Sequence, residues 1–453
     1  NLSHNKNLSF VKKLIIPDGV RSVSYEALQS LPALEYAEIG ADISQLYNYY
    51  FPDTLKGIKV SENNKNYCSL DDVVYNKAMT ELVIYPFSRG RRLSLPATVT
   101  DVSVISDSGA NVDLDISDDN ESFITLEGVT YTENMKTVVS CDTEKSGKYK
   151  MPSSVTGVVY GAFANCTKLT EVQLSPALTS VVYKMFINCT SLKTVTVPDS
   201  VVQIDGAAFA GCTSLEGITL PEKVVSIGEY AFSGSGLTKI NLPQQLERIE
   251  YNAFGGSKLK SISIPKSVTY ISDNAFASTP LVSLTLPASN VQICEAAFAY
   301  TDLAELTLPN GPTFGGSAFA ECKSLKKVTV AEGRTELGCE MFRDCNALET
   351  VVLPSTLNYI DEKAFLDCKS LKSISLPENI TAIWQKAFKN CTSLKSINLP
   401  QGLSVIGDSA FEGCALTSVK LPERLDYLGA GAFNGCPLSE LEIKNISEIG
   451  GGA

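Results

Sequence analysis

The sequence predicts a β-rich α/β solenoid, in which coils of about 23 residues stack along one axis and each coil adds a strand to a parallel sheet. Three observations predict this fold. One apolar pattern recurs along most of the 453 residues, each copy alternates apolar and polar residues as a strand does, and Pro and Gly occupy fixed turn positions. Because a single coil cannot bury its own apolar side, neighbouring coils must stack.

A phenylalanine marks each regular copy of the repeat. Thirteen copies follow one another at intervals of 21 to 23 residues. The phenylalanines are Phe163, Phe186, Phe209, Phe232, Phe254, Phe276, Phe298, Phe319, Phe342, Phe365, Phe388, Phe411 and Phe433. A period held over this many copies is typical of a solenoid. We therefore expect a column of stacked phenylalanines in the core.

The elements of one coil can be assigned from the copy at 208–228, AFAGCTSLEGITLPEKVVSIG. Its stretch LEGITL has the L-x-x-I-x-L spacing of a leucine-rich-repeat strand. The proline that follows ends the strand because it has no N–H to donate. The segment IGEYAF at 227–232 then supplies a Gly turn and one short helical or 3-10 turn. We expect the strands to form a concave parallel sheet, with these turns on the other side.

Small residues stand three positions after each phenylalanine. Nine are cysteines: Cys166, Cys189, Cys212, Cys322, Cys345, Cys368, Cys391, Cys414 and Cys436. Ser235, Ser257, Thr279 and Thr301 take the same place in four other copies. Such a position is a small buried slot, whose weak donor can satisfy a turn carbonyl of its own or the neighbouring coil. We expect free structural thiols; a metal site and a disulfide framework are the alternatives, and the odd total of 13 cysteines prevents complete intramolecular pairing.

The first 157 residues follow the plan only loosely, although degenerate coils begin near the start of the chain. A different unit occurs twice with an offset of 56 residues, at about 60–101 and 116–157. Its two β-rich runs, placed around Asn76–Lys77 in the first copy, predict hairpins that project from the solenoid edge. They are either simple insertions or places of recognition. The regular solenoid is expected over 158–453, with the chain ending in mid-repeat.

Composition argues against several functions. With 38 basic and 50 acidic residues, the net charge of -12 disfavours nucleic acid as a partner, because phosphate binding needs clustered Lys and Arg. The one histidine, His4, lies close to a polar N-terminus, which disfavours histidine-dependent catalysis and histidine zinc sites. No apolar run approaches the roughly 20 residues that span a bilayer. We expect no enzymatic activity, no cofactor and no membrane insertion by this segment.

Acidic residues gather between Leu93 and Met135, where nine carboxylates and no Lys or Arg occur. The run DLDISDDNE at 113–121 offers oxygen ligands that a hard cation would accept. An EF-hand loop, however, needs Gly at its sixth and Glu at its twelfth position, where Asp118 and Ile124 stand. We interpret the stretch as a solvated acidic face, with calcium binding as the alternative.

The outward strand positions predict a plane of small polar side chains with scattered lysines and no aromatic anchor. The candidate partner contacts are Lys193, Lys260, Lys326, Lys327, Lys372 and Lys395. Exposed lysines also serve to keep a sheet soluble, and the N-terminal hairpin region is the alternative binding site. Eight of the 18 tyrosines lie in the first 100 residues, including Tyr47, Tyr49 and Tyr50, and we interpret them as core filling in the degenerate coils.

The pattern AFxxCxxLxxIxLPxxVxxIG at 208–228 resembles the BspA-like leucine-rich-repeat family of surface proteins. The resemblance covers about two thirds of the chain, and the unit NNKNY...DDVVYNKAMTELVIYP is similar to the N-terminal insertions of that family. It implies an extracellular or surface-anchored protein of a host-associated microbe that adheres to host matrix or to other cells, and it brings no catalytic residues.

From these observations we expect a monomeric, non-enzymatic binding protein, whose partner is a protein or glycan on the host matrix or a neighbouring cell. A structural spacer that displays other domains on the cell surface is the alternative. The anchor or signal is expected outside this segment. One departure from the pattern matters, because Arg334 stands where Val or Ile is expected and leaves the local geometry of the coils around 313–337 open.

Overall fold

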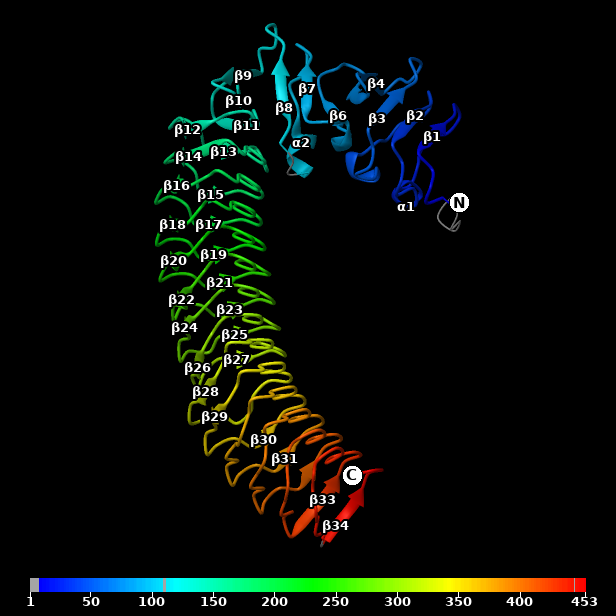
Figure 1. Cartoon of the computed structure of the whole chain (residues 1–453). Helices are drawn as coiled ribbons and strands as arrows, with labels where there is room; N and C mark the ends of the chain where they lie inside the picture. Colours follow the sequence, from blue (N-terminus) through cyan, green and yellow to red (C-terminus); the bar gives the residue numbers. More distant parts are fainter. Residues whose placement is uncertain (1–7, 109–110, 444) are drawn as a thin grey trace. The chain divides into compact units, whose positions relative to one another are not determined.

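The structure, a computed structural model, describes residues 8–108, 111–443 and 445–453 (Figure 1). His4 lies outside the described residues. Contacts divide the chain into two compact units. Unit 1 is Asn1–Leu178 with Val182–Thr190, and unit 2 is Thr179–Val181 with Ser191–Ala453. The change of repeat pattern at 157/158 remains a prediction about the domain boundary.

Unit 1 holds the described helices and the less regular strands. The helices are α1 (Tyr25–Gln29) and α2 (Ser103–Ser108), with the 3-10 helices η2 (Asn48–Tyr50) and η3 (Phe87–Arg89). The strands are β1 (Lys13–Ile16), β2 (Tyr36–Ile39), β3 (Gly57–Val60), β4 (Tyr67–Leu70), β5 (Val73–Asn76), β6 (Leu82–Ile84), β7 (Arg92–Leu95), β8 (Asp113–Ile116), β9 (Phe123–Leu126), β10 (Val129–Thr132), β11 (Thr137–Cys141), β12 (Gly147–Lys150), β13 (Gly157–Val158) and β14 (Leu169–Gln173). Parallel pairs such as β1–β2, β2–β3 and β7–β8 join successive coils.

Unit 2 repeats two kinds of strand. The first kind lies in the L-x-x-I-x-L stretch and comprises β16 (Thr194–Thr196), β18 (Gly217–Thr219), β20 (Lys239–Asn241), β22 (Ser261–Ser263), β24 (Ser283–Thr285), β26 (Glu305–Leu308), β28 (Lys327–Val330) and β29 (Thr350–Val352). The second kind lies at the second apolar pair and comprises β15 (Ser180–Val181), β17 (Gln203–Ile204), β19 (Ser226–Ile227), β21 (Arg248–Ile249), β23 (Tyr270–Ile271), β25 (Gln292–Ile293), β27 (Thr313–Phe314), β30 (Tyr359–Ile360), β31 (Ala382–Ile383), β32 (Val405–Ile406), β33 (Arg424–Leu428) and β34 (Asn445–Ile449).

Parallel pairing along unit 2 confirms the predicted leucine-rich-repeat solenoid. The longest sheet is the seven-stranded ladder from β15 to β27, while β18–β20, β22–β24 and β26–β28–β29 form shorter ladders of the first kind. The second apolar pair therefore builds the more continuous sheet, which the sequence pattern did not reveal. In Figure 1 the first-kind strands of unit 2 lie along one edge and the phenylalanine turns along the other.

The phenylalanine column forms the predicted core. From Phe209 to Phe433, the stacked pairs of successive rings have interplanar angles of 1–19°. Phe254 and Phe276, for example, have ring centroids 5.0 Å apart, and neither ring is exposed. This distance is close to the spacing of about 4.8 Å between neighbouring strands. The rings and the strands can therefore stack with the same repeat distance along the axis.

The turn around each phenylalanine pairs its backbone with the next coil. In the coil of Phe209, the flanking Ala207 and Gly211 are left-handed, with φ of 53° and 70°. The N–H groups of these three residues donate to carbonyls of the following coil at 2.7–2.8 Å. Ala210 and Cys212 instead donate to carbonyls three residues earlier, which is the predicted 3-10 turn. The backbone donors of this turn are thereby satisfied, which offsets the strain of the left-handed residues.

The cysteine column also connects successive coils. The thiol of Cys391 donates to the carbonyl of Phe365 at 3.2 Å, and the thiol of Cys414 donates to Phe388 at 3.1 Å. In both pairs the carbonyl belongs to the preceding coil. This confirms the expectation that the slot satisfies a turn carbonyl.

Ser and Thr in the same slot differ in whether their hydroxyls have a hydrogen-bond acceptor. The hydroxyls of Thr279 and Thr301 donate to the phenylalanine carbonyls of their own coils, at 2.7 and 3.0 Å. The hydroxyls of Ser235 and Ser257 are buried and have no hydrogen-bond partner among the described residues. Both serines therefore leave a desolvated polar atom in the core.

The hairpin units of unit 1 differ from the expected layout. The turn beginning at Asn76–Lys77 joins β5 to β6, and a further antiparallel turn at Asp71–Asp72 joins β4 to β5. The turn at Asp71–Asp72 was not predicted, because it lacks the glycine that usually marks such turns. The expected projection from the edge is wrong for β5, because Val73, Val74 and Tyr75 are at most 1% exposed and alternate between two apolar clusters.

Two buried asparagines, 56 residues apart, make equivalent contacts in the two hairpin units. The Nδ2 group of Asn64 donates to the carbonyls of Gly40 and Ile43, both at 3.0 Å. That of Asn120 donates to Pro96 and Val99, both at 2.9 Å, and these partners are again 56 residues further on. Each asparagine thus fastens its unit to the preceding coil.

Arg334 is accommodated in the core rather than expelled from it. Only 7% of the residue is exposed, and its Nη1 atom donates to the carbonyls of Pro309 and Pro312 at 3.2 and 2.8 Å. Its guanidinium lies 4.8 Å from the ring centroid of Phe314, and burial lowers its pKa. The geometry does change locally, because the second-kind ladder stops at β27 and resumes at β30.

We expect the column thiols to be reduced and slow to react in the native protein. Burial raises the pKa of Cys368 and Cys391, and the thiolate is the reactive form. In a thiol-exchange assay without reductant, the exposed Cys339 should react first, followed by the half-buried Cys68, Cys294 and Cys436. All 13 should react after denaturation. Fewer than nine free thiols in the denatured, unreduced protein would contradict the free-thiol column.

Exchanging Ser and Cys in the slot should change stability in opposite directions. Ser235→Cys and Ser257→Cys should each raise the free energy of unfolding by about 0.5–1.5 kcal/mol, because the longer C–S bond reaches the preceding carbonyl. Cys391→Ser should lower it by about 1–3 kcal/mol. Thr279→Cys is the control, since Thr279 already has its acceptor. Urea unfolding measures all four, and equal stabilities would refute this account of the slot.

Candidate functional site

The six candidate lysines are all exposed on the strand face of unit 2, and we call them the lysine column. Five of them directly follow the first leucine of the strand stretch, and Lys327 occupies the next position after Lys326. One to three coil steps separate the successive lysines of these five, so they stand about 5 to 15 Å apart along the axis. The structure therefore places the predicted residues on one face without joining them into a pocket.

Acidic side chains interrupt the lysine column. Glu216 and Glu349 occupy the same coil position as the lysines, and the Nζ atom of Lys372 lies 3.1 Å from a carboxylate oxygen of Glu349. The other five lysines make no ion pair with the described residues. A shallow hollow of about 760 Å³ opens on this face where Gly217 lacks a side chain, but no member of the column lines it.

The acidic stretch of unit 1 uses its carboxylates in separate contacts. Asp113 accepts hydrogen bonds from the N–H and the hydroxyl of Thr143, both at 3.0 Å. Asp115 lies 3.4 Å from Arg92 on the neighbouring strand. Among the described residues, no group of three or more His, Cys, Asp or Glu side chains gathers as a metal site would require.

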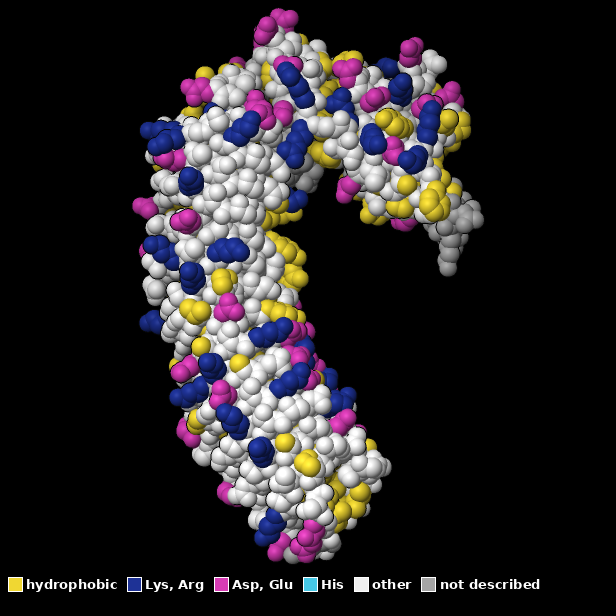
Figure 2. Space-filling model, viewed as in Figure 1, with side chains coloured by type: hydrophobic (Ala, Val, Ile, Leu, Met, Phe, Trp, Pro, Cys, Tyr) yellow, Lys and Arg dark blue, Asp and Glu magenta, His cyan; other side chains and the backbone are white. Residues whose placement is uncertain are grey.

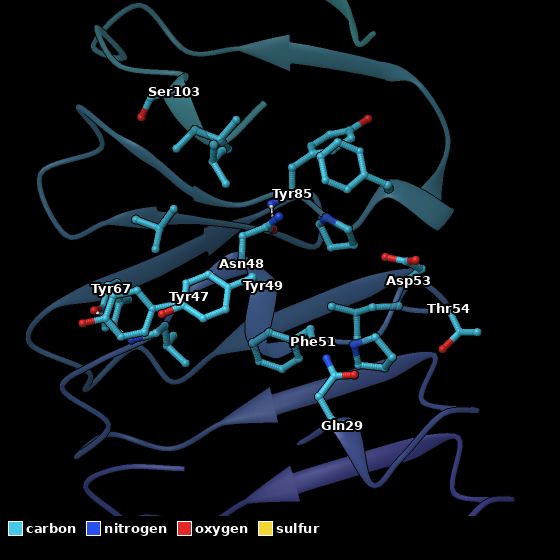
Figure 3. Close-up of a pocket in the computed structure, with 18 of the residues that line it drawn as sticks. Gln29, Tyr47, Asn48, Tyr49, Phe51, Asp53, Thr54, Tyr67, Tyr85 and Ser103 are labelled. Atoms are coloured by element: carbon cyan, nitrogen blue, oxygen red, sulfur yellow. Dashed lines mark hydrogen bonds between the residues drawn. The ribbon is translucent and has the colours of Figure 1, made fainter. Parts of the chain in front are cut away.

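Sequence reasoning missed a hollow in unit 1, which we call the tyrosine hollow. Its volume is about 870 Å³. Its lining includes Gln29, Tyr47, Asn48, Tyr49, Phe51, Asp53, Thr54, Tyr67, Glu81, Tyr85 and Ser103. Figure 3 shows Tyr47, Tyr49 and Tyr67 on one side, and Asp53 with Thr54 on the other. The hollow thus presents aromatic and polar groups together.

Two anchors hold η2 at the base of the tyrosine hollow. Phe51, which directly follows η2, is only 6% exposed and packs in an apolar cluster with Leu28 and Ile58. The side-chain oxygen of Asn48 accepts a hydrogen bond from the backbone N–H of Tyr85 at 3.1 Å, drawn as a dashed line in Figure 3. With Phe51 in the core, Tyr47 and Tyr49 remain at the surface, while Tyr50 is half-buried against the same cluster.

Four tyrosines meet beside the hollow. The ring centroids of Tyr47 and Tyr49 are 5.6 Å apart, and Tyr25 of α1 lies 6.3 Å from Tyr49 and 6.0 Å from Tyr50. Tyr49 is 65% exposed, Tyr25 45% and Tyr47 40%. The interpretation of Tyr47 and Tyr49 as core filling is therefore wrong. Tyr50, in contrast, is half-buried and packs against the cluster that contains Phe51.

The electrostatics of the tyrosine hollow are neutral to acidic. Its lining contains Asp53 and Glu81 but no Lys, Arg, His or Cys. Burial, followed by the neighbouring Tyr49 and Tyr47, raises the pKa of Tyr50, so its hydroxyl stays protonated at neutral pH. The arrangement suits the binding of an uncharged amphipathic molecule.

Exposed aromatic residues also lie along the turn edge of unit 2, where Figure 2 shows hydrophobic side chains. Tyr230 and Tyr251 of neighbouring coils form an edge-to-face pair with ring centroids 5.2 Å apart. Tyr300 is 50% exposed. Tyr270, Tyr359 and Tyr427 lie on second-kind strands, whereas the described first-kind strands of unit 2 hold no aromatic residue, in agreement with the lack of an aromatic anchor predicted there.

Comparison with known families gives one match. The sequence model described as "BspA type Leucine rich repeat region (6 copies)" matches residues 5–94, 140–258, 225–349, 291–414 and 381–453. No protein with a curated description matches the chain. Among the described residues, no helix has both the length and the apolar character needed to cross a membrane.

Several solved structures are similar to this chain. A leucine-rich repeat protein from Bacteroides ovatus shares 26% identity with a TM-score of 0.54, covering 77% of this chain and 90% of its own. A leucine rich cell surface protein from Faecalibacterium prausnitzii shares 22% identity with a TM-score of 0.42, covering 84% and 97%. The pneumococcal vaccine antigen PcpA shares 20% identity with a TM-score of 0.47, covering 71% and 99%. The first of these supports the leucine-rich-repeat fold.

Proposed function

The chain belongs to the BspA-type leucine-rich-repeat family, and on that premise we propose that it is a non-enzymatic binding protein of the cell surface or extracellular space. Its partner is a protein or glycan on the host matrix or on another cell. The observation that carries this proposal is the rigid ladder of unit 2, which holds exposed side chains in fixed columns. Fixed columns suit binding, because little conformational entropy is lost when a partner docks.

The lysine column is the proposed contact surface for an acidic partner. Lys193, Lys260, Lys326, Lys327 and Lys395 are exposed and lack an ion pair among the described residues, so a partner need not displace an internal carboxylate. Scattered lysines spaced along one axis favour several weak contacts rather than one central anchor. Such contacts are expected to weaken with salt.

A structural spacer is the second candidate function. A stack of near-identical coils supports it, because the length of such a spacer depends on the number of coils and not on any outward side chain. Binding of the full chain to immobilised matrix proteins, glycans and whole cells separates the two functions. The binding proposal expects saturable binding to at least one surface. The spacer is favoured if the chain binds none of these surfaces and the removal of coils changes only the distance that the chain spans.

Charge reversal tests the lysine column on any surface that the chain binds. Replacing all six lysines by Glu should raise the Kd at least about tenfold at low salt and flatten its salt dependence. The control reverses six exposed lysines outside both the column and residues 60–157: Lys168, Lys223, Lys258, Lys266, Lys323 and Lys369. The control should bind nearly as the natural chain does. If both variants bind with equal affinity, the lysine column is not the contact surface, and residues 60–157 become the expected binding site.

A further inference from the structure

We propose that the tyrosine hollow of unit 1 binds a neutral oligosaccharide. This inference deepens the proposed binding function and rests on it. It assigns a ligand class to a site that is separate from the lysine column, and three properties of the hollow support it: its exposed rings, its polar side chains and its charge.

The exposed rings supply stacking surfaces. Tyr47 and Tyr49 line the hollow with 40% and 65% of their surfaces exposed. A sugar ring presents an apolar C–H face, which can stack on an aromatic face, while its hydroxyls remain at the rim. Tyrosine suits this contact because it offers a large amphipathic surface with only two side-chain torsions to restrict.

The polar groups match hydroxyls, which both donate and accept. The side-chain oxygen of Asn48 is committed to the backbone N–H of Tyr85, so its amide nitrogen can donate to a ligand. The amide nitrogen of Gln29 lies 3.5 Å from the carbonyl of Tyr50, which leaves its oxygen to accept. The carboxylates of Asp53 and Glu81 add further acceptors around the hollow.

Charge and size narrow the ligand class. The lining has two carboxylates and no cationic side chain, and the nearby Arg89 guanidinium lies 5.7 Å from the ring centroid of Tyr85, so the lining itself favours a neutral ligand over a phosphate, sulfate or uronate. The volume of about 870 Å³ lies within the range of small-molecule sites and accommodates a short oligosaccharide. Pro32, Pro52 and Pro86 also line the hollow, which makes a proline-rich peptide the competing occupant. We favour the sugar because amides and carboxylates accompany the rings.

The site is held in shape before any ligand arrives. The hydroxyl of Thr54 donates to the carbonyl of Leu34 at 2.8 Å, and that of Ser88 donates to the carbonyl of Asp53 at 2.5 Å. Together with buried Phe51, these bonds fix the chain on both sides of Pro52. A preformed site lowers the entropic cost of binding a weak ligand such as a sugar.

The test uses the full chain and saturation-transfer NMR with calorimetry. The probes are maltotriose, cellotriose and N-acetyllactosamine as neutral sugars, with trigalacturonic acid as the charged counterpart and a proline-rich peptide as the competitor. We expect binding of at least one neutral sugar and none of the trigalacturonic acid. Binding of the peptide alone, or of no neutral sugar, would overturn the proposal.

Variants locate any binding in the hollow. Tyr49→Ala and Tyr47→Ala should each raise the Kd for the bound sugar about tenfold, as expected for one lost aromatic contact. Tyr49→Phe should retain affinity because it keeps the ring. Tyr300→Ala, which removes an equally exposed tyrosine of unit 2, is the matched control and should have no effect. Thermal unfolding verifies that each variant is folded.

The outcomes separate this inference from the proposed function. Unchanged sugar affinity in both Tyr47→Ala and Tyr49→Ala would overturn the site even if the chain binds matrix or cells. Saturable binding to cells that persists in folded Tyr49→Ala protein would leave the proposed function intact and place its contact elsewhere. Loss of sugar binding in the alanine variants, with retention in Tyr49→Phe and Tyr300→Ala, would support the tyrosine hollow.

Discussion

The stacking of each phenylalanine turn on the next is the contact on which the whole solenoid depends. The ring is only one part of it. Two left-handed residues flank each ring and direct three backbone N–H groups at the following coil, as Ala207, Phe209 and Gly211 do. A coil without a neighbour would leave these donors unpaired and the rings exposed, which is why the fold exists only as a stack.

This constraint divides the side chains of the regular coils into two classes. Inward positions accept little variation, because each side chain must match those of two neighbouring coils. Some exceptions are partly compensated, as when the Nη1 atom of buried Arg334 donates to two proline carbonyls and its guanidinium lies over the ring of Phe314, whereas Ser235 and Ser257 leave their hydroxyls unpaired among the described residues. Outward positions meet no such demand, so the solenoid can carry lysines on its strand face and tyrosines along its turn edge without loss of stacking.

The degenerate coils of unit 1 lose regularity and gain a concave surface. Where η2 replaces the phenylalanine turn, Phe51 enters the core and Tyr50 packs against it, while Tyr47 and Tyr49 remain exposed. Asn64 and Asn120 add side-chain hydrogen bonds to the backbone pairing that joins these coils. The tyrosine hollow forms at this irregularity and is lined by exposed aromatic side chains, whereas the hollow on the regular coils of unit 2 has no aromatic residue in its lining.

The sequence by itself determined the solenoid, the period, the phenylalanine core, the role of the cysteine slot and the exposure of the lysine column. Each of these repeats, so a single spacing argument covers every copy. Only the tertiary structure decided that the second apolar pair builds the longer sheet, that β5 is buried between two clusters, and that Tyr47 and Tyr49 surround a hollow. Most of these features occur where the period fails, and there the direction of a side chain depends on tertiary contacts that no repeated spacing specifies.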